Sequence, residues 1–169
     1  KNFRLIIYIC VYNPKNFSCM INRELYMEQI TPFIDKPFVK VITGIRRCGK
    51  SVVLRLIREE LLRRGVSEDY IIYMNFESFE WIDMKEAKAL YAHIREATKA
   101  SGKYYILLDE IQEVTDWEKA VNAFLVDLDV DIYVTGSNSR LLSSEFSTYL
   151  AGRYVAFHIM TLSFREYLL

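Results

Sequence analysis

One short stretch, Gly44 to Ser51, constrains the fold of this chain more than any other. It reads Gly-Ile-Arg-Arg-Cys-Gly-Lys-Ser and follows an apolar, β-branched run at residues 39–43, which is typical of a buried strand. Beyond it, apolar residues recur at helical spacing as far as a stop at Gly65, namely Val53, Leu56, Ile57 and Leu61. The stretch is therefore predicted to join a strand to a helix through a tight turn bounded by glycines.

Strand-like and helix-like segments alternate along the rest of the chain. Further strands are expected at residues 70–76, 104–108, 131–135 and 154–159. Helices are expected after the capping-box pairs Asp83 with Glu86, Thr115 with Glu118, and Ser163 with Glu166. This order predicts an α/β fold: a five-stranded parallel sheet with helices on both faces and with ligands outside the carboxyl ends of the strands.

The glycine-bounded turn also has the spacing of a phosphate-binding P-loop. Its successive backbone N–H groups and the positive end of the next helix would converge on the β-phosphate of a nucleotide. Lys50 can reach the β and γ oxygens, and Ser51 can bind magnesium. The fold is thus predicted to be that of a P-loop NTPase, whose nucleotide-binding residues are Gly44, Ile45, Arg46, Arg47, Cys48, Gly49, Lys50, Ser51 and Val52.

Three side chains within this loop have their own interpretations. Arg46 and Arg47 either touch phosphate or are solvated. Cys48 is interpreted as a small filler rather than a nucleophile, because no histidine lies near it in the sequence.

Two carboxylates, Asp109 and Glu110, follow the most apolar of the expected strands. The carboxyl ends of parallel strands share one edge of the sheet, so both side chains should lie near the phosphates. Hydrolysis requires a partner for the magnesium ion, assigned to Asp109, and a group that orients or deprotonates water, assigned to Glu110. The alternative is that one of them caps a following helix.

Two further polar residues are candidates for catalysis. Asn138 follows the expected fourth strand and either holds the water or senses the γ-phosphate, or else serves as a turn residue or cap. Arg153, just before the fifth strand, either neutralises charge on the transferred phosphoryl group or lies on the surface.

The bulk composition excludes several other classes of protein. Lysine plus arginine equals aspartate plus glutamate at 22 each, which gives no general attraction to nucleic acid or anionic membrane. The three cysteines are odd in number and lack metal-like spacing, which favours a reducing cytoplasm. The longest apolar run, residues 5–12, is shorter than the roughly 20 residues that span a bilayer, so no membrane partner is expected.

Taken together, these motifs resemble the AAA+-like P-loop ATPases of bacteria and archaea, in which a C-terminal domain follows the ATPase domain. Beside the P-loop, the resemblance rests on Leu-Leu-Asp-Glu-Ile-Gln at 107–112, Thr-Gly-Ser-Asn-Ser at 135–139, Leu-Ala-Gly-Arg-Tyr at 150–154 and Leu-Ser-Phe-Arg-Glu-Tyr-Leu at 162–168. The match runs from about Ile30 to Leu169. Because Lys1 is not a start and Met20 opens a polar, helix-compatible stretch, residues 1–19 are interpreted as an N-terminal extension that is non-native or poorly ordered, followed by an ATPase core at 20–162. Ser163 and Glu166 begin a helix that the sequence cuts short, so residues 163–169 are interpreted as the start of a truncated C-terminal region.

The resemblance also implies a chemistry. ATP rather than GTP would be the ligand, with Mg2+ as cofactor, Lys50 and Ser51 in the Walker A role, Asp109 and Glu110 in the Walker B role, and a sensor near Asn138. It leaves open whether Arg153 acts in its own subunit, and it leaves room for a homo-oligomer and for a protein or DNA client bound through the C-terminal domain.

Four functions compete on this basis. The first is an ATPase whose hydrolysis drives a conformational change, and the second is an ATP-binding switch that hydrolyses little until a missing domain or partner supplies an arginine. A GTPase is disfavoured because neither Asp-x-x-Gly after the third strand nor Asn-Lys-x-Asp is present. A small-molecule kinase would need an acceptor site and a lid, which the sequence does not indicate.

Overall fold

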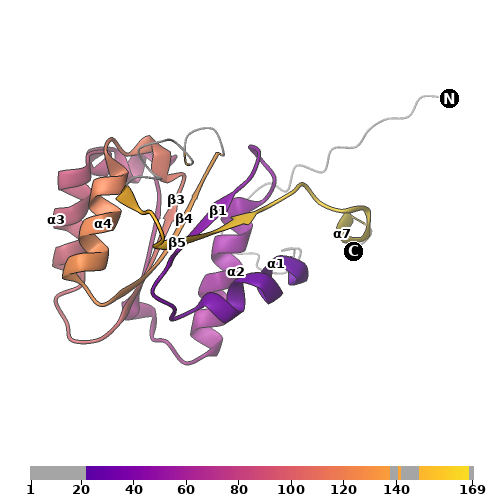
Figure 1. Cartoon of the computed structure of the whole chain (residues 1–169), viewed down its shortest axis with the longest axis horizontal. Coiled ribbons are helices and arrows are strands. Elements are labelled where there is room, and N and C mark those ends of the chain that lie inside the picture. The colour runs from indigo at the N-terminus through magenta and orange to yellow at the C-terminus, as the bar shows by residue number, and fades with distance from the viewer. Residues whose placement is uncertain (1–21, 138–140, 142–148, 168–169) are drawn as a thin grey trace.

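Five strands pair in parallel to form one sheet in the order β2-β3-β4-β1-β5 (Figure 1). This computed structural model describes residues 22–137, 141 and 149–167. The predicted extension at residues 1–19 and Asn138 lie outside the described residues. Each strand ends within one residue of its predicted bounds, which are β1 (Val39–Thr43), β2 (Ile71–Asn75), β3 (Tyr104–Asp109), β4 (Val130–Gly136) and β5 (Tyr154–His158). The predicted fold class is therefore confirmed.

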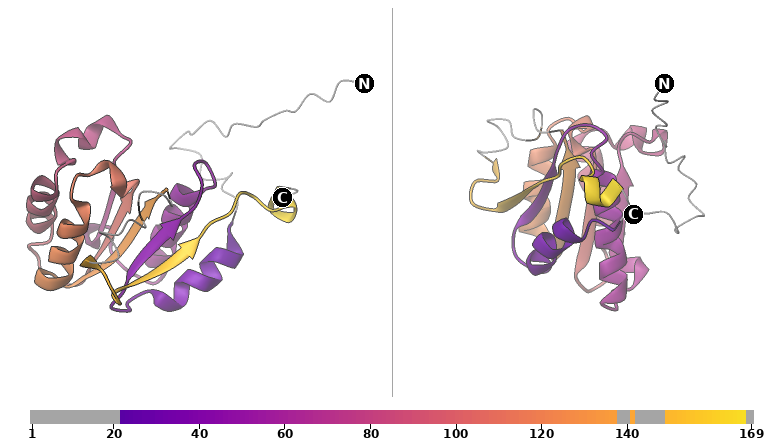
Figure 2. Two further views of the ribbon diagram at one scale, coloured as in Figure 1. Left: turned by 45° about the horizontal axis from the view of Figure 1, so that its top comes forward. Right: turned by 90° about the vertical axis from the view of Figure 1, so that its right-hand side faces the viewer.

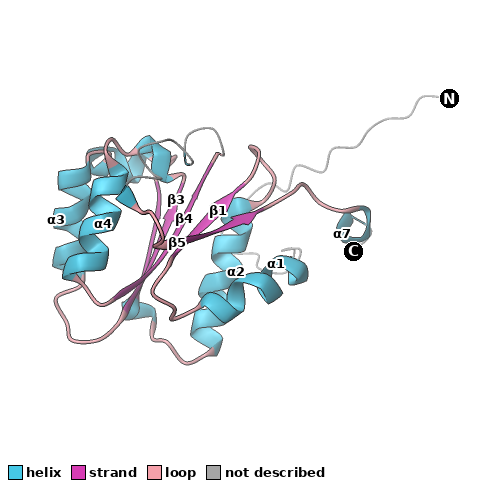
Figure 3. Ribbon diagram, in the orientation of Figure 1, coloured by secondary structure: helices cyan, strands magenta, loops and turns pink. Residues whose placement is uncertain are grey.

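The helices cover both faces of the sheet (Figures 2 and 3). One face packs against α1 (Glu24–Ile30) and α2 (Lys50–Arg63). The other packs against α3 (Ala87–Ala97) and α4 (Trp117–Asp127). Short 3-10 turns and a terminal helix complete the described chain: Thr31–Phe33, Glu68–Tyr70, Phe79–Met84, Ile111–Glu113 and α7 (Phe164–Tyr167).

The strand that precedes the phosphate-binding loop lies inside the sheet. β1 pairs with β4 on one side and with β5 on the other, and all five of its residues are buried. A strand shielded on both faces should be continuously apolar or β-branched, and Val-Lys-Val-Ile-Thr departs from this only at Lys40. The loop that follows β1 is thus anchored at the carboxyl edge between β4 and β5.

Of the predicted capping boxes, only the last is formed by side chains. Glu166 N–H lies 3.3 Å from Ser163 Oγ, and Ser163 N–H donates to Glu166 Oε2 at 2.7 Å. The structure places the N-caps of α3 and α4 at Glu86 and Asp116, and neither residue makes a side-chain cap hydrogen bond. Backbone hydrogen bonds form instead: Ala87 N–H donates to the carbonyl of Thr115 and Thr115 N–H donates to that of Lys85. The segments that precede the two helices are thus paired through their backbones. The helices begin after Glu86 and Asp116, so the predictions for Asp83 with Glu86 and for Thr115 with Glu118 were wrong about the cap residue.

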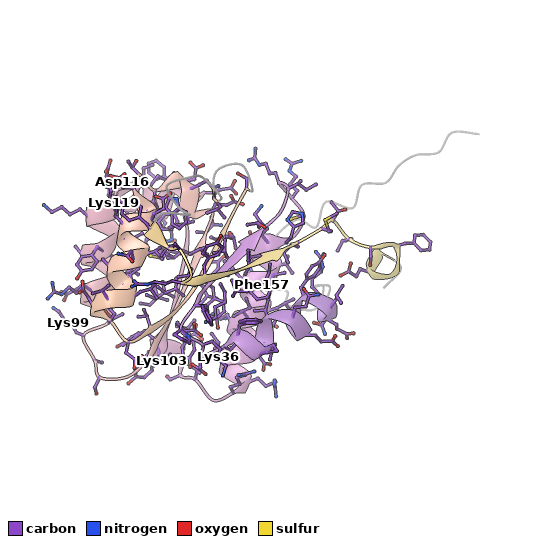
Figure 4. The ribbon with its side chains drawn as sticks, in the orientation of Figure 1. Lys36, Lys99, Lys103, Asp116, Lys119 and Phe157 are labelled. Atoms are coloured by element: carbon purple, nitrogen blue, oxygen red, sulfur yellow. The ribbon has the colours of Figure 1, made fainter. Side chains whose placement is uncertain are left out.

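A buried ion pair joins β1 to β4 at the amino end of the strands. Lys40 and Asp131 are 0% and 2% exposed, and their side chains are in contact. Asp131 Oδ2 also accepts hydrogen bonds from Tyr133 O–H and from the backbone N–H of Asp35, both at 2.8 Å. Burial lowers the pKa of Lys40, and the carboxylate of Asp131 opposes that shift. Lys36, which precedes β1, lies at this end of the sheet (Figure 4).

Replacing Asp131 by asparagine should lower the free energy of unfolding by about 3 kcal/mol, because a buried ammonium group would lose its counter-charge. The measurement is urea denaturation at neutral pH. Asp129→Asn is the matched control, since Asp129 is exposed directly before β4 and the substitution keeps its backbone carbonyl, which accepts from Tyr104 N–H. Equal unfolding midpoints for the two variants would contradict the assignment.

Candidate functional site

The loop after β1 is shaped by its two glycines. A Cβ on Gly44 would lie 2.4 Å from the carbonyl oxygen of Ile159 and 2.6 Å from Cys48 Sγ, so no side chain fits there. Gly49 has a φ of 101°, in the region that glycine adopts readily. α2 starts at the next residue and runs for 14 residues, so its amino terminus opens onto the loop. Such a helix end attracts anions through its free N–H groups and its dipole.

The side chains of the loop point in different directions. Ile45, Arg46 and Arg47 are exposed, and Arg46 Nη2 lies 3.5 Å from an oxygen of the exposed Glu77. Cys48 is 2% exposed and packs in the core between the sheet and α2. The structure thus places both arginines in solvent and the cysteine in a filling position.

Lys50 connects the loop to the acidic pair. Its side chain is 4% exposed, and Nζ lies 3.5 Å from the carbonyl oxygen of Gly44 and 3.4 Å from that of Ile45. The same nitrogen lies 3.2 Å from Glu110 Oε1. The turn and the carboxylates, which are about 60 residues apart in sequence, therefore converge at one edge of the sheet.

Asp109, the last residue of β3, is fully buried. Its Oδ1 accepts a hydrogen bond from Thr135 Oγ1 at 2.5 Å, and its Oδ2 accepts one from the hydroxyl of Tyr73 at 3.1 Å. Burial raises the pKa of Tyr73, and the charge of Asp109 adds to that shift, so the phenol remains a donor. Two neutral donors hold the carboxylate while each oxygen keeps a further lone pair.

Glu110 sits in a strained backbone conformation. Its φ of 55° and ψ of 48° place it in the left-handed region, which non-glycine residues rarely adopt and which clusters at functional sites. Its N–H donates to Thr135 Oγ1 at 3.0 Å, and its Oε2 accepts from Gln112 Nε2 at 2.5 Å. Backbone and side chain are thus both fixed, and the carboxylate is directed at Lys50 rather than capping a helix.

Three residues at this edge were not assigned a role from the sequence. Thr135 and Gln112 lie inside the motifs noted above, and their polar side chains there could have indicated that they belong to the site. Tyr73 carries no such signal, since it lies within a strand expected to be apolar. Parallel pairing of β2 with β3 brings its hydroxyl to Asp109.

Arg153 lies at the opposite edge of the sheet. Its carbonyl accepts from the N–H of Val39, the first residue of β1, and its Nη1 lies 3.3 Å from Asn122 Oδ1. The P-loop follows the last residue of β1, and five residues of strand separate the two edges by about 16 Å. The structure therefore does not bring Arg153 to Lys50 of the same chain.

The residues at the carboxyl edge fit a magnesium ion that is shared with a ligand. Mg2+ prefers oxygen donors and is usually held by one or two side chains together with phosphate and water. The buried carboxylate of Asp109 and the hydroxyl of Ser51 at the start of α2 provide such donors. Over residues 22–137, 141 and 149–167 there is no group of three or more His, Cys, Asp or Glu that could hold a metal. In that same part of the chain, none of the helices has the length and apolar character needed to cross a bilayer.

Comparison with known proteins places the chain among relatives of similar sequence. It is 48% identical over 152 residues to an uncharacterized protein of Haemophilus influenzae and 34% identical over 149 residues to one of Methanocaldococcus jannaschii. The alignments cover 89% and 88% of this chain but only 38% and 31% of those proteins. The chain thus spans less than two fifths of either relative.

Solved structures share the fold at low sequence identity. The chain superposes on Hsp104, in a complex with ATPγS and casein, with a TM-score of 0.60 and 12% identity over 87% of this chain and 28% of that one. AMPPCP-bound DnaA from Aquifex aeolicus gives a TM-score of 0.55 and 18% identity over 85% of this chain and 48% of that one. The AAA domain family matches residues 36–168, which include all five strands of the sheet together with α2, α3 and α4. With its five parallel strands and its glycine-bounded loop, this chain belongs to the AAA domain family of P-loop proteins.

Proposed function

We propose that this protein binds ATP and hydrolyses it with Mg2+, and that hydrolysis drives a conformational change. The observation that carries the proposal is the 3.2 Å contact between Lys50 Nζ and Glu110 Oε1. It joins the loop that would hold the phosphates to the carboxylate that would act on water. Membership of the AAA domain family supports nucleotide binding as the underlying activity.

The loop residues would bind the triphosphate. Backbone N–H groups from Gly44 to Ser51 would cradle the phosphates at the start of α2, and Lys50 would contact the β and γ oxygens. Ser51 and Asp109 would hold Mg2+, which when bound neutralises charge on the phosphates. Val52 and the other loop residues would contribute through their backbone.

Glu110 would orient the attacking water and take its proton. Phosphate oxygens would compete with Glu110 for the ammonium group of Lys50, leaving the carboxylate available to water. Gln112 and Thr135 hold the side chain and the backbone of Glu110, so little reorganisation would be required. Asn138, which comes two residues after β4 along the chain, would hold the same water or contact the γ-phosphate.

Arg153 would act on a neighbouring subunit rather than on its own. Arg153 lies at the amino edge of the sheet, away from the phosphate loop of its own chain. In an oligomer, the amino edge of one copy could face the carboxyl edge of the next, which supports this role. We therefore propose a homo-oligomer in which Arg153 meets the phosphates in trans. The protein would work in the cytoplasm, with a protein or DNA client contacted by the parts of the longer relatives that this chain does not cover.

A second candidate function is favoured by the position of Arg153 at the amino edge. If the arginine is supplied only in trans, an isolated copy would bind ATP and hydrolyse it slowly, as a molecular switch does. Basal turnover measured beside nucleotide affinity separates the two: tight binding with turnover that rises with protein concentration supports the switch.

Nucleotide binding should be visible as thermal stabilisation. ATP with Mg2+ at about 100 times its dissociation constant should add about 2.7 kcal/mol to the stability of the folded state. For a domain of this size, that corresponds to a rise of roughly 5–10 °C in the melting temperature. GTP with Mg2+ is the comparison, and ATP without Mg2+ is the control for the metal. An unchanged melting temperature with ATP and Mg2+ would reject the proposal.

A further inference from the structure

Arg23, the residue before α1, lies buried between three segments that are distant in sequence. Its side chain is 1% exposed. Nη1 donates to the carbonyl of Cys48 and Nη2 to the carbonyl of Met160, both at 2.8 Å. Nε lies 2.8 Å from Glu166 Oε1, an ion-pair distance without the alignment of a hydrogen bond. A guanidinium group buried to this degree needs such partners, and its planar fork allows it to serve several at once.

The contact with Cys48 acts on the phosphate loop itself. A trans peptide group is planar, and its C=O and N–H bonds point in opposite directions. Holding the carbonyl of Cys48 against Arg23 therefore directs the N–H of Gly49 away from Arg23. Gly49 permits this close approach, because a Cβ there would lie 2.9 Å from Nη1 of Arg23. Gly49 directly precedes Lys50, so its N–H belongs to the set that would face the phosphates.

The other contacts tie Arg23 to the chain that leaves the sheet after β5. Met160 is held at both of its backbone groups, since its N–H donates to the hydroxyl of Tyr26 at 3.0 Å and its carbonyl accepts from Arg23. The guanidinium also lies over the ring of Tyr26, 4.7 Å from its centroid. Glu166, in α7, is 17% exposed and supplies the carboxylate that faces Arg23.

We infer that Arg23 is a positioning residue that holds the Cys48–Gly49 peptide in its phosphate-binding orientation, and that Glu166 sets the position of Arg23. A movement of α7 would then change the phosphate loop, and a change in the loop would be transmitted to α7. This inference rests on the proposed nucleotide binding for its consequence, although the contact between Arg23 and the loop does not depend on it.

The test uses Arg23→Gln and Glu166→Gln, with Glu28→Gln as the matched control. Glu28 is an exposed carboxylate on α1, the helix that Arg23 precedes, so its replacement removes the same charge as Glu166→Gln. The first measurement is the amide resonance of Gly49 by NMR without nucleotide, which is sensitive to the hydrogen bond at the Cys48 carbonyl and to the orientation of the Cys48–Gly49 peptide. The second is the dissociation constant for a fluorescent ATP analogue with Mg2+. Arg23→Gln should move the resonance and weaken binding about tenfold, and Glu166→Gln should do the same about threefold.

A Gly49 resonance that is unmoved in folded Arg23→Gln would overturn the positioning role. An unmoved resonance in Glu166→Gln would overturn the link to α7, and this variant decides the inference if Arg23→Gln does not fold. A change of the same size in Glu28→Gln would also overturn it, because the effect would then be one of net charge. If the parent protein binds no ATP while the resonance moves in both variants, the proposed function fails and the positioning role stands.

Discussion

Glu110→Gln should lower the rate of ATP hydrolysis by about 10² to 10⁴, because the amide cannot accept the proton of the attacking water. ATP binding should change by less than about threefold, since the replacement keeps the size of the side chain and an oxygen that can accept from Gln112 and Lys50. The measurement is single-turnover hydrolysis at saturating ATP and Mg2+, together with a direct binding titration.

Glu77→Gln is the control for this experiment. Glu77 is an exposed carboxylate two residues beyond β2, at the carboxyl edge of the same sheet. Its replacement should leave turnover unchanged. Hydrolysis by Glu110→Gln at the parent rate would reject Glu110 as the base and would favour the view that its contact with Lys50 is structural.

Lys50→Ala should raise the dissociation constant for ATP by about 10² to 10³. The ammonium group is the charge within the loop that would face the triphosphate, and truncating one partner of a buried charge pair typically costs 2–5 kcal/mol. The same substitution leaves Glu110 without its ion pair, so part of the effect would appear as a change in stability. Isothermal titration of the folded variant with ATP and Mg2+ measures the affinity, and urea denaturation measures the stability separately.

Lys119→Ala provides the comparison for the loss of a lysine. Lys119 is an exposed residue of α4 whose Nζ lies 2.9 Å from Asp116 Oδ2, and both side chains are labelled in Figure 4. Its replacement should leave ATP affinity within about twofold, since exposed ion pairs contribute little. An affinity for ATP that is the same in Lys50→Ala as in the parent protein would contradict the assignment of the loop.

The strands were predicted well because their signals are local. A run such as Val39–Thr43 records its own burial in its apolar and β-branched residues, and Gly44 and Gly49 record the turn that follows. The capping boxes expected for α3 and α4 were wrong for a different reason. The segments before the two helices, about 30 residues apart, form backbone hydrogen bonds with each other, and no local sequence pattern contains that pairing.

The residues of the candidate site also fall into those that the sequence could place and those that it could not. Lys50, Asp109 and Glu110 could be proposed from the sequence because parallel strands bring their carboxyl ends to one edge whatever the strand order. By the same rule Arg153, which precedes the fifth strand, belongs at the amino edge, and the parallel pairing of β5 with β1 confirms that it lies there, away from the loop. Its contact with Asn122 of α4 is what the sequence did not show.

The sequence by itself determined the glycine-bounded loop, the acidic pair and the α/β class, because each depends on residue types at short spacing. The tertiary structure decided what supports the loop. Tyr73 reaches Asp109 across 36 residues, and Arg23 reaches Cys48 across 25 and Met160 across 137. These contacts depend on the order of strands in the sheet and on where the chain returns after β5. Both are set by which apolar faces of strands and helices pack against each other in the folded chain. The spacing of residues along the sequence does not specify those partners.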